Sequence, residues 1–417
     1  MKLLGLPLGI SSTFWFLIGV IRAISERFSK RKKNRNRGRR LKLEDIAAIV
    51  PAHNEELVIR ECIRSLKKVI QSKQVYVVSD GSSDKTYRRA RMEGSHVSKL
   101  QPGRGKARAM IYLLNRFRLF KRYKLIFIID ADTMVDGKFI PNALEVLKDP
   151  EIGVVFGSPR ILWPNHIIPN KKLYYVAYRD RLNRLLQIFY VFGQTWKYTN
   201  TNYVVPGFCT VYRSKVLKKL KLDTPGLLIE DFNLAFQLHR QKLGKIGHNF
   251  SLIAWDQYPN NLKDYWNQVL RWNIGFFQTV RKNGVWPSLF WLALLTFMLE
   301  VTLNALFTFS LPFLILFFIA KIVSSGSWLF SEYARLYMSI GPFQHISFRD
   351  LIFYLFVYDY AVTLIIGFAQ KRPQYALYGL FFFFMHFVTS LILFSSIIPG
   401  FFQSSEGRWS SPSRRTL

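Results

Sequence analysis

Acidic side chains stand at two points of this 417-residue chain where an apolar run has just ended. Asp130 and Asp132 follow one such run, and Glu230 and Asp231 follow another. Side chains alternate along an extended chain, so Asp130 and Asp132 point to the same side. Their hard oxygens can hold Mg²⁺ or Mn²⁺ while a bound diphosphate supplies the remaining ligands. The second pair precedes a helical spacing, where acids also act as a simple N-terminal cap.

A basic segment with two glycines, 103–107, lies upstream of both acidic pairs. Glycines let the backbone approach a phosphate, a helix start favours anions, and Lys106 adds a positive charge. The spacing differs from that of a Walker loop, and the Ser or Thr of that loop is absent. The segment therefore indicates a phosphate contact through Lys106, whereas Arg104 could simply be solvated.

The pentad 268–272 precedes the long apolar region of the chain. In a helix, Gln268 lies near both Arg271 and Trp272, three and four residues on. Arg271 suits planar, bidentate contacts with a diphosphate, and Trp272 offers an apolar face to a sugar ring. The same residues could instead anchor an amphipathic helix at a membrane surface. Taken alone, the pentad leaves both readings open.

The elements that position these residues follow from hydrophobic periodicity. Apolar runs with the length of buried parallel strands occur at 46–50, 75–78 and 125–129. Helical spacing separates or follows them at 55–70, 85–93 and 105–119. This alternation predicts an α/β domain with a doubly wound sheet, whose ligands lie beyond the carboxyl ends of the strands. The candidate residues stand at those ends.

Composition divides the chain into an apolar segment 1–24, a polybasic linker 25–42, a water-soluble domain 43–285, an apolar region 286–403 and a tail 404–417. The first segment has the roughly 20 apolar residues that a membrane-crossing helix needs. A cleaved signal peptide is excluded because the positive charge follows the apolar run and no small-residue cleavage site is evident. We therefore expect an N-terminal transmembrane helix.

The net charge of +33 is concentrated after this segment, where residues 27–42 hold ten Lys or Arg and no acid. Such a strip beside an apolar span marks the cytoplasmic side and contacts anionic lipids, so we do not expect a nucleic-acid partner. Cys62 and Cys209 are too few for a disulfide framework and fit a reducing compartment. These features predict a multi-pass protein of the cell membrane with a cytoplasmic domain.

The number of spans in the apolar region stays open. The stretch 288–323 contains Pro312 and could form one tilted span or two, while 351–370 and 377–402 are clearer spans. Glu300 and Asn304 lie within the first stretch, where polar groups face either a cavity or a partner helix.

Taken in chain order, Asp130-Ala131-Asp132, Ile229-Glu230-Asp231 and the pentad resemble the core of a membrane-embedded family 2 glycosyltransferase. That group contains the cellulose, chitin, hyaluronan and poly-N-acetylglucosamine synthases. The resemblance implies a cytoplasmic GT-A domain, similar to nucleotide-diphospho-sugar transferases, with a mixed, largely parallel sheet. It also implies an α-helical transmembrane region.

The resemblance also assigns roles to the donor side of the site. It places the nucleotide sugar against Pro51, Glu55, Asp80, Lys106, Asp130, Gln268 and Arg271. It places the metal on Asp130 and Asp132. The family usually has two consecutive aspartates where this chain has Ser79-Asp80, which leaves the choice of base more open.

On the acceptor side, the resemblance makes Asp231 the general base, with Glu230 beside it. It places the acceptor sugar against Gly207, Phe208 and Trp272. The family more often has Thr or Ser at the position of Ile229. The tail segment 408–414 resembles the ending of bacterial poly-N-acetylglucosamine synthases, which implies a gating role for Trp409 and Arg414.

These features together predict an inverting, metal-dependent and processive enzyme that extends a β-linked polysaccharide from a UDP-sugar. The tail favours UDP-N-acetylglucosamine as the donor, and export through the enzyme's own helices allows for accessory export subunits. Two alternatives stay open. One is a non-processive membrane enzyme that adds a single sugar to a lipid or oligosaccharide. The other is a non-catalytic, polybasic membrane scaffold.

Overall fold

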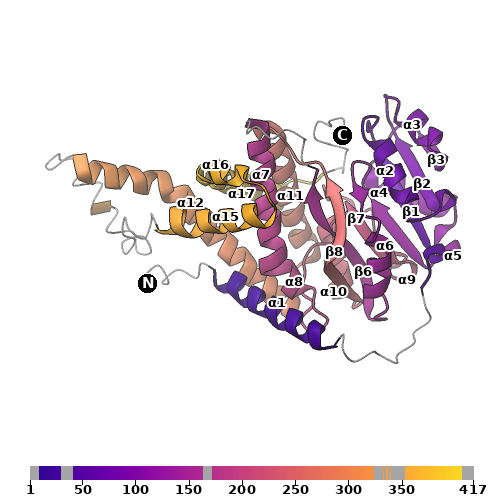
Figure 1. The fold of residues 1–417 in the computed structure, drawn as a ribbon, viewed down its shortest axis with the longest axis horizontal. Coiled ribbons are helices and arrows are strands. Elements are labelled where there is room, and N and C mark those ends of the chain that lie inside the picture. The colour runs from indigo at the N-terminus through magenta and orange to yellow at the C-terminus, as the bar shows by residue number, and fades with distance from the viewer. Residues whose placement is uncertain are drawn as a thin grey trace.

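The computed structural model describes residues 9–29, 41–162, 171–323 and 353–405, together with residues 332, 335, 336 and 339. An α/β domain occupies one end of the molecule, and long apolar helices extend from the other (Figure 1). The expected combination of an α/β domain with a helical apolar region is therefore present in the described residues.

Eight strands form one mixed sheet in the order β3-β2-β1-β4-β7-β6-β8-β5. They are β1 (Ile46–Ala52), β2 (Val75–Asp80), β3 (His96–Leu100), β4 (Leu125–Ile129), β5 (Met134–Val135), β6 (Ile152–Ile161), β7 (Cys209–Arg213) and β8 (Lys245–Asp256). Strands β3, β2, β1 and β4 run parallel, whereas β7 is antiparallel to β4 and β6. The three predicted apolar runs are β1, β2 and β4, so their carboxyl ends meet at one edge as expected.

Helices cover both faces of this sheet. They are α2 (Ile59–Lys67), α3 (Thr86–Met92), α4 (Lys106–Arg116), α5 (Leu119–Arg122), α6 (Phe139–Val146), α9 (Ser214–Leu217) and α10 (Asp231–Arg240). The helix expected at 55–70 begins only at Ile59, because Val58, which precedes it, has a non-helical φ of −125°. The helix expected at 105–119 ends early, because Arg118 has a φ of 49° and separates α4 from α5.

Strand β1 is buried along its whole length. Ala48 and Val50 belong to one apolar cluster with Ile63 of α2, while Ile49 belongs to the opposite cluster with Leu113 of α4. A strand covered on both faces has a continuous apolar sequence, and this is why the strand could be predicted. Since both faces are covered, the strand ends are left to form a site.

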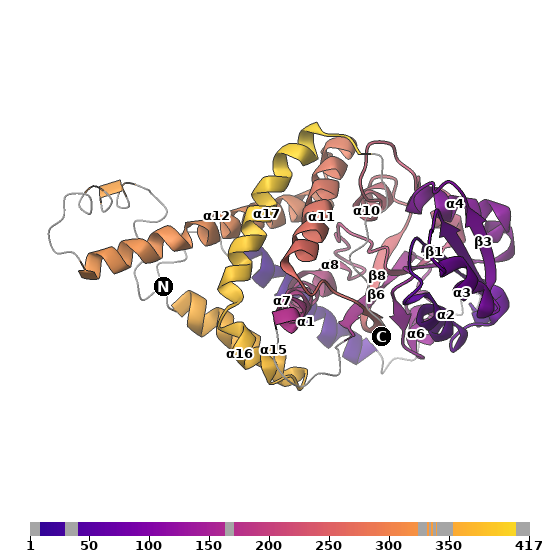
Figure 2. The ribbon, with the colours of Figure 1, turned by 90° about the horizontal axis from the view of Figure 1, so that it is seen from above.

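The remaining helices lie beside the carboxyl edge of the sheet. They are α1 (Ile10–Ser29), α7 (Lys171–Leu186), α8 (Phe192–Gln194), α11 (Leu262–Asn283), α12 (Leu289–Val323), α15 (Asp359–Ala369), α16 (Gln374–Gly379) and α17 (Phe382–Phe402). One π-helix, η4 (Gln187–Val191), joins α7 to α8, and another, η5 (Phe353–Tyr358), precedes α15. Helix α17 lies alongside α11 (Figure 2).

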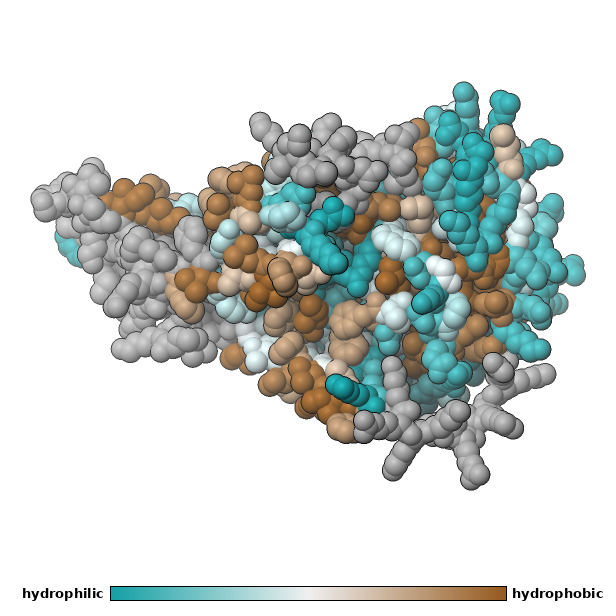
Figure 3. Space-filling view, in the orientation of Figure 1, coloured by the Kyte–Doolittle hydropathy of each residue, from teal (hydrophilic) through white to brown (hydrophobic). Residues whose placement is uncertain are grey.

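Two helices of the described part are long and apolar enough to cross a membrane: Leu289–Phe313 within α12, and α17. Helix α12 continues through Pro312 as one helix of 35 residues, so the stretch 288–323 is a single element. Hydrophobic side chains gather on the surface at this end of the molecule, and hydrophilic ones on the sheet domain (Figure 3). The spans expected at 1–24 and 351–370 are not among the two and stay predictions.

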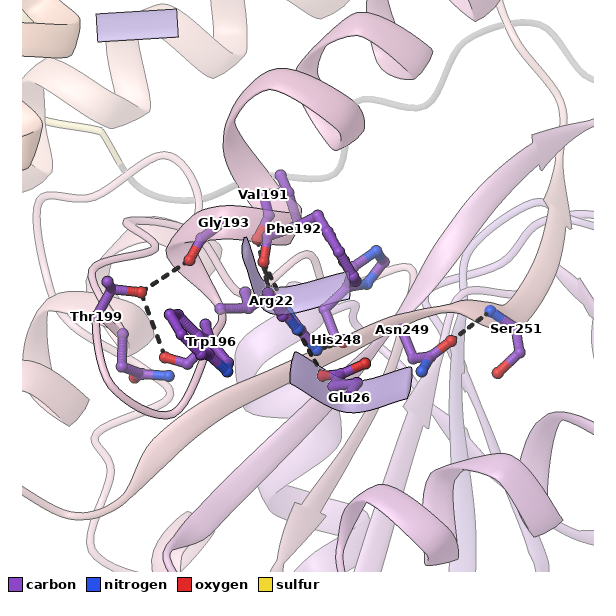
Figure 4. Close-up of polar contacts among 12 residues, drawn as sticks. Arg22, Glu26, Val191, Phe192, Gly193, Trp196, Thr199, His248, Asn249 and Ser251 are labelled. Atoms are coloured by element: carbon purple, nitrogen blue, oxygen red, sulfur yellow. Dashed lines mark hydrogen bonds and ion pairs between the residues drawn. The ribbon is translucent and has the colours of Figure 1, made fainter. Parts of the chain in front are cut away.

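Helix α1 is fastened to the α/β domain by a buried arginine (Figure 4). The Arg22 guanidinium donates to the carbonyl oxygens of Phe192 and His248, each at 2.7 Å, and to Thr195 Oγ1 at 2.9 Å. Its Nε pairs with Glu26 Oε1 at 2.8 Å. One side chain of α1 thus joins α8 to strand β8.

The other end of α1 is held by Glu300 of α12. Glu300 Oε2 accepts the backbone N–H of Ser11 at 2.6 Å, and its Oε1 accepts the hydroxyl of Tyr190 at 2.7 Å. The first N–H groups of a helix have no partner inside the helix, so a carboxylate there satisfies them and suits the helix dipole. Glu300 therefore packs helices together, which was one of the two roles expected for it.

Replacing Arg22 should test this attachment. We expect Arg22→Met to lower the free energy of unfolding by about 3 kcal/mol, because buried carbonyls lose their donors. Denaturant unfolding in detergent micelles measures the change. Arg27→Met is the matched control, because Arg27 is exposed on the same helix. Its replacement should lower the free energy of unfolding by less than about 0.5 kcal/mol. Equal losses for the two variants would contradict the assignment.

Candidate active site

A single cavity of about 1400 Å³ lies at the carboxyl edge of the sheet and continues between the apolar helices. Almost all of the residues predicted from the sequence line it: Pro51, Glu55, Lys106, Asp130, Asp132, Gly207, Phe208, Glu230, Asp231, Gln268, Arg271 and Trp272. Asp80 does not line it, and Trp409 and Arg414 lie outside the described residues. The fold thus brings residues that are far apart in the sequence together around one cavity.

Asp80 supports a loop that lines the cavity, although Asp80 itself does not line it. It is fully buried, and its two carboxylate oxygens accept the backbone N–H groups of Arg104 at 2.8 Å and Gly105 at 2.7 Å. Gly81 and Gly103 pass so closely that a Cβ on Gly81 would lie 2.7 Å from the Cα of Gly103. Asp80 therefore holds the loop that starts α4, and its contact with a nucleotide stays a prediction.

Lys106, the first residue of α4, lies among the acidic groups. Its Nζ is 2.8 Å from Asp130 Oδ1 and 3.4 Å from Glu230 Oε1. Burial alone would lower the pKa of this ammonium, but the carboxylates of Asp130, Glu230 and Asp231 raise it. Lys106 thus stays charged and balances the acids that line the cavity.

Asp231 begins α10 at the wall of the cavity. Burial, and then the charge of Glu230, raise the pKa of its carboxyl to about 7, although Lys106 acts in the opposite direction. A carboxylate with a pKa near neutrality is well suited to accept a proton at physiological pH. Gly207 permits this packing, because a Cβ there would lie 2.6 Å from Asp231 Oδ1.

Asp130 and Asp132 follow β4 and face the cavity, where their oxygens could bind a divalent cation. Among the described residues, no group of three His, Cys, Asp or Glu side chains could hold a metal ion. Within the described ranges, Asp130 and Asp132 would be the carboxylates that hold the metal, and a bound diphosphate would supply further oxygens. This donor set fits a metal that arrives with its substrate.

The pentad lies on α11, as predicted, and three of its polar or aromatic side chains line the cavity. No described residue donates a hydrogen bond to the buried Gln268 Oε1, so a donor group of a ligand would be satisfied there. One face of Trp272 is covered by the guanidinium of Arg179, 4.5 Å from the ring centroid. Only part of this ring is therefore available to a sugar.

The cavity extends as a corridor between α12 and α17. Its polar lining consists of Thr302, Asn304, Thr308, His386, Thr389 and Ser390. Asn304 faces this space, whereas Glu300, one turn earlier, holds α1. Of these residues only Asn304 was singled out from the sequence, because the others are ordinary in apolar helices and meet only through tertiary packing.

The last described residues of the tail return to the cavity. Ser405 lines it and donates its backbone N–H to the carbonyl of Gly226 at 3.4 Å, while the carbonyl of Gln403 accepts Gln278 Nε2 at 3.2 Å. The start of the tail therefore lies beside the same cavity as Glu230 and Asp231.

The role given to Asp80 can be checked by hydrogen exchange. We expect Asp80→Asn to weaken protection of the 103–105 amides by about 1–3 kcal/mol, because an amide side chain cannot accept both N–H groups. Mass spectrometry of the peptide containing these residues measures it. Asp136→Asn, which removes an acceptor from an exposed turn, should leave the segment unchanged. Unchanged protection in Asp80→Asn would refute this role.

Comparison with known proteins places this site in a family. The family model described as "Glycosyltransferase like family 2" matches residues 44–275. The probable glycosyltransferase YdaM of Bacillus subtilis is 23% identical over 370 residues, which cover 80% of this chain and 77% of that protein. The low-salt glycan biosynthesis hexosyltransferase Agl6 of Haloferax volcanii is 30% identical over 117 residues, 27% of each chain.

Among solved structures, the mannosyltransferase PcManGT of Pyrobaculum calidifontis, in complex with GDP-Man and Mn²⁺, has a similar fold. It aligns with 94% of this chain and 97% of its own, at 15% identity and a TM-score of 0.53. The shared architecture is a GT-A-like α/β fold. Since the family model covers more than half of the residues and includes the acids, Lys106 and the pentad, the chain belongs to glycosyltransferase family 2 and is a glycosyltransferase.

Proposed function

We propose that this enzyme transfers a sugar from a UDP-sugar, with inversion, to the end of a growing β-linked polysaccharide. UDP-N-acetylglucosamine is the first donor to test. The observation that carries the proposal is the continuity of one cavity, with the acids at one end and side chains of α12 and α17 at the other. An acceptor in the corridor would have its end at Asp231.

The reaction follows from the placement of the acids. Asp231 takes the proton of the acceptor hydroxyl, whose oxygen attacks the anomeric carbon from the face opposite the diphosphate. The bond to the diphosphate breaks, so the configuration inverts. Asp130 and Asp132 would hold Mg²⁺ or Mn²⁺, which neutralises charge on the leaving diphosphate when bound. Lys106 and Arg271 contribute positive charge on the same side.

The corridor supports a glycan acceptor because hydroxyl, amide and imidazole groups line it. Thr302, Asn304 and Thr308 of α12 face it together with His386 and Thr389 of α17. Such groups can exchange hydrogen bonds with sugar hydroxyls, whereas a lipid tail offers them none. Export of the polymer along this corridor would require that α12 and α17 cross the membrane.

The membrane assignment rests on charge and apolar surface together. Two helices of membrane-crossing length and the basic run 27–42 support a catalytic domain on the cytoplasmic side, beside anionic lipids. The exposed apolar side chains of α12, such as Leu292, Leu299 and Phe313, would then face lipid.

A second candidate is the addition of one sugar to a lipid-linked acceptor. It is favoured by the apolar part of the corridor, to which Phe297, Met298 and Leu393 contribute. Both candidates use the same acids and donor. A non-catalytic scaffold is disfavoured, because a scaffold needs neither the acids nor the cavity.

Product length separates these candidates. Purified enzyme in nanodiscs, given radiolabelled UDP-N-acetylglucosamine with Mg²⁺ or Mn²⁺, should form long chains while most acceptor stays unextended. A chelator should stop the reaction, and Asp132→Ala should lower it at least about 100-fold. Products with one added sugar would replace the polymerase proposal with the second candidate. An unchanged rate in Asp132→Ala would refute the metal assignment.

The pH dependence tests the base. The rate should rise with pH through about 7, because only the deprotonated carboxylate of Asp231 accepts the proton. Glu230→Gln removes a charge that raises the pKa of Asp231, so the rise should move to lower pH. Glu44→Gln, an exposed glutamate outside the site, is the matched control. A profile that Glu230→Gln does not move would contradict the coupling of these acids.

A further inference from the structure

Arg179 of α7 is a cavity residue that no sequence motif singled out. Its guanidinium carbon lies 4.5 Å from the ring centroid of Trp272 and 5.8 Å from that of Tyr258. Asn183, one turn along α7, donates a hydrogen bond to the Tyr258 hydroxyl. Two aromatic rings thus fix the position of this cation at the cavity wall.

Within the described part of the chain, Arg179 forms no ion pair, and its buried Nε has no hydrogen-bond partner. Two other cations of the cavity are paired: Lys106 with Asp130, and Arg108 with Asp223. The side chain of Arg179 is partly exposed, and its planar donors match a phosphate or a carboxylate. Arg179 therefore presents an unsatisfied site for an anion.

The position of Arg179 indicates which substrate carries that anion. Its neighbour Tyr178 contacts His386 Nδ1 at 3.0 Å and Thr389 Oγ1 at 3.3 Å, both on α17. Arg179 lines the same cavity from the next position of α7, and the ring it stacks on, Trp272, belongs to α11. The donor's diphosphate is expected at Lys106, the two aspartates and Arg271. Arg179 instead comes from α7 and stacks on Trp272, the ring assigned to the acceptor sugar, so we assign the anion at Arg179 to the acceptor.

We propose that Arg179, stacked on Trp272, forms a subsite for an anionic group of the acceptor, either a phosphate or a carboxylate. The inference rests on the proposed function, since it needs an acceptor in this cavity. A phosphate would belong to a lipid-linked acceptor, and a carboxylate to an acidic sugar of a polymer. In both cases the anion lies beside the ring that supports the acceptor sugar.

The experiment compares three acceptors with the purified enzyme in nanodiscs. They are an isoprenoid lipid that carries a sugar through phosphate, an oligosaccharide that ends in a uronic acid, and an uncharged oligosaccharide of the same length. We expect at least a tenfold higher kcat/KM for one anionic acceptor than for the uncharged one. The anionic acceptor that is preferred identifies the source of the anion.

Arg179→Gln should lower kcat/KM for the preferred acceptor by about 10- to 100-fold, mainly through KM, because one charge-assisted contact is lost. The KM of the UDP-sugar and the use of the uncharged acceptor should change less than about twofold. Arg179→Lys should recover only part of the loss, because an ammonium cannot make the planar contact. Arg108→Gln is the matched control, since it removes a cavity cation that is already paired.

Measuring UDP release without acceptor distinguishes failure of the anion subsite from failure of the proposed function. If donor hydrolysis proceeds and the three acceptors react equally, or Arg179→Gln affects them equally, the anion subsite is refuted while the proposed function stands. A higher KM for the UDP-sugar in Arg179→Gln would also refute it by placing Arg179 on the donor. Absence of both UDP release and transfer with every donor would refute the proposed function itself.

Discussion

The site depends on the ion pairs that the Lys106 ammonium forms with Asp130 and Glu230. Asp130 comes from the end of a strand, and Glu230 and Asp231 come from the start of a helix 100 residues later. Their negative charges would repel one another across the cavity if no cation lay between them. Because Lys106 contacts both groups, the acids can stay close while one of them keeps a proton affinity near neutrality. Lys106 thus supplies the charge balance, whereas burial and the charge of Glu230 raise the pKa of Asp231.

Much of this arrangement is predictable because buried strands leave a plain signature. The runs that become β1 and β4 are apolar throughout, since helices cover both faces, and their ends mark the catalytic edge. Strand β3 was not predicted, because it is a half-exposed edge strand with the mixed sequence His96–Leu100. Strands β6 and β7 were not predicted either, although they are largely buried and lie inside the sheet.

Roles that depend on distant partners were beyond the sequence. Asp80 reads as a ligand residue, yet its oxygens are used by the backbone of Arg104 and Gly105, which only the loop path reveals. Arg179 has no local signature, because its character comes from rings on two other segments. Glu300 and Asn304 looked equivalent until packing separated them. Residue type and spacing suggest which chemistry a side chain could perform. Its contacts with neighbouring residues in the folded protein decide which role it has.

The attachment of α1 has a consequence for the order of folding. Helix α1 is synthesised before its partners: those of Arg22 lie 170 and 226 residues later, and Ser11 is held by a residue 289 positions away. Since chains are made from the amino terminus, α1 cannot dock until the sheet is complete and α12 has emerged. During that interval the apolar face of α1 lacks the partners that cover it in the folded protein. Docking of α1 is therefore a late step in the assembly of this enzyme.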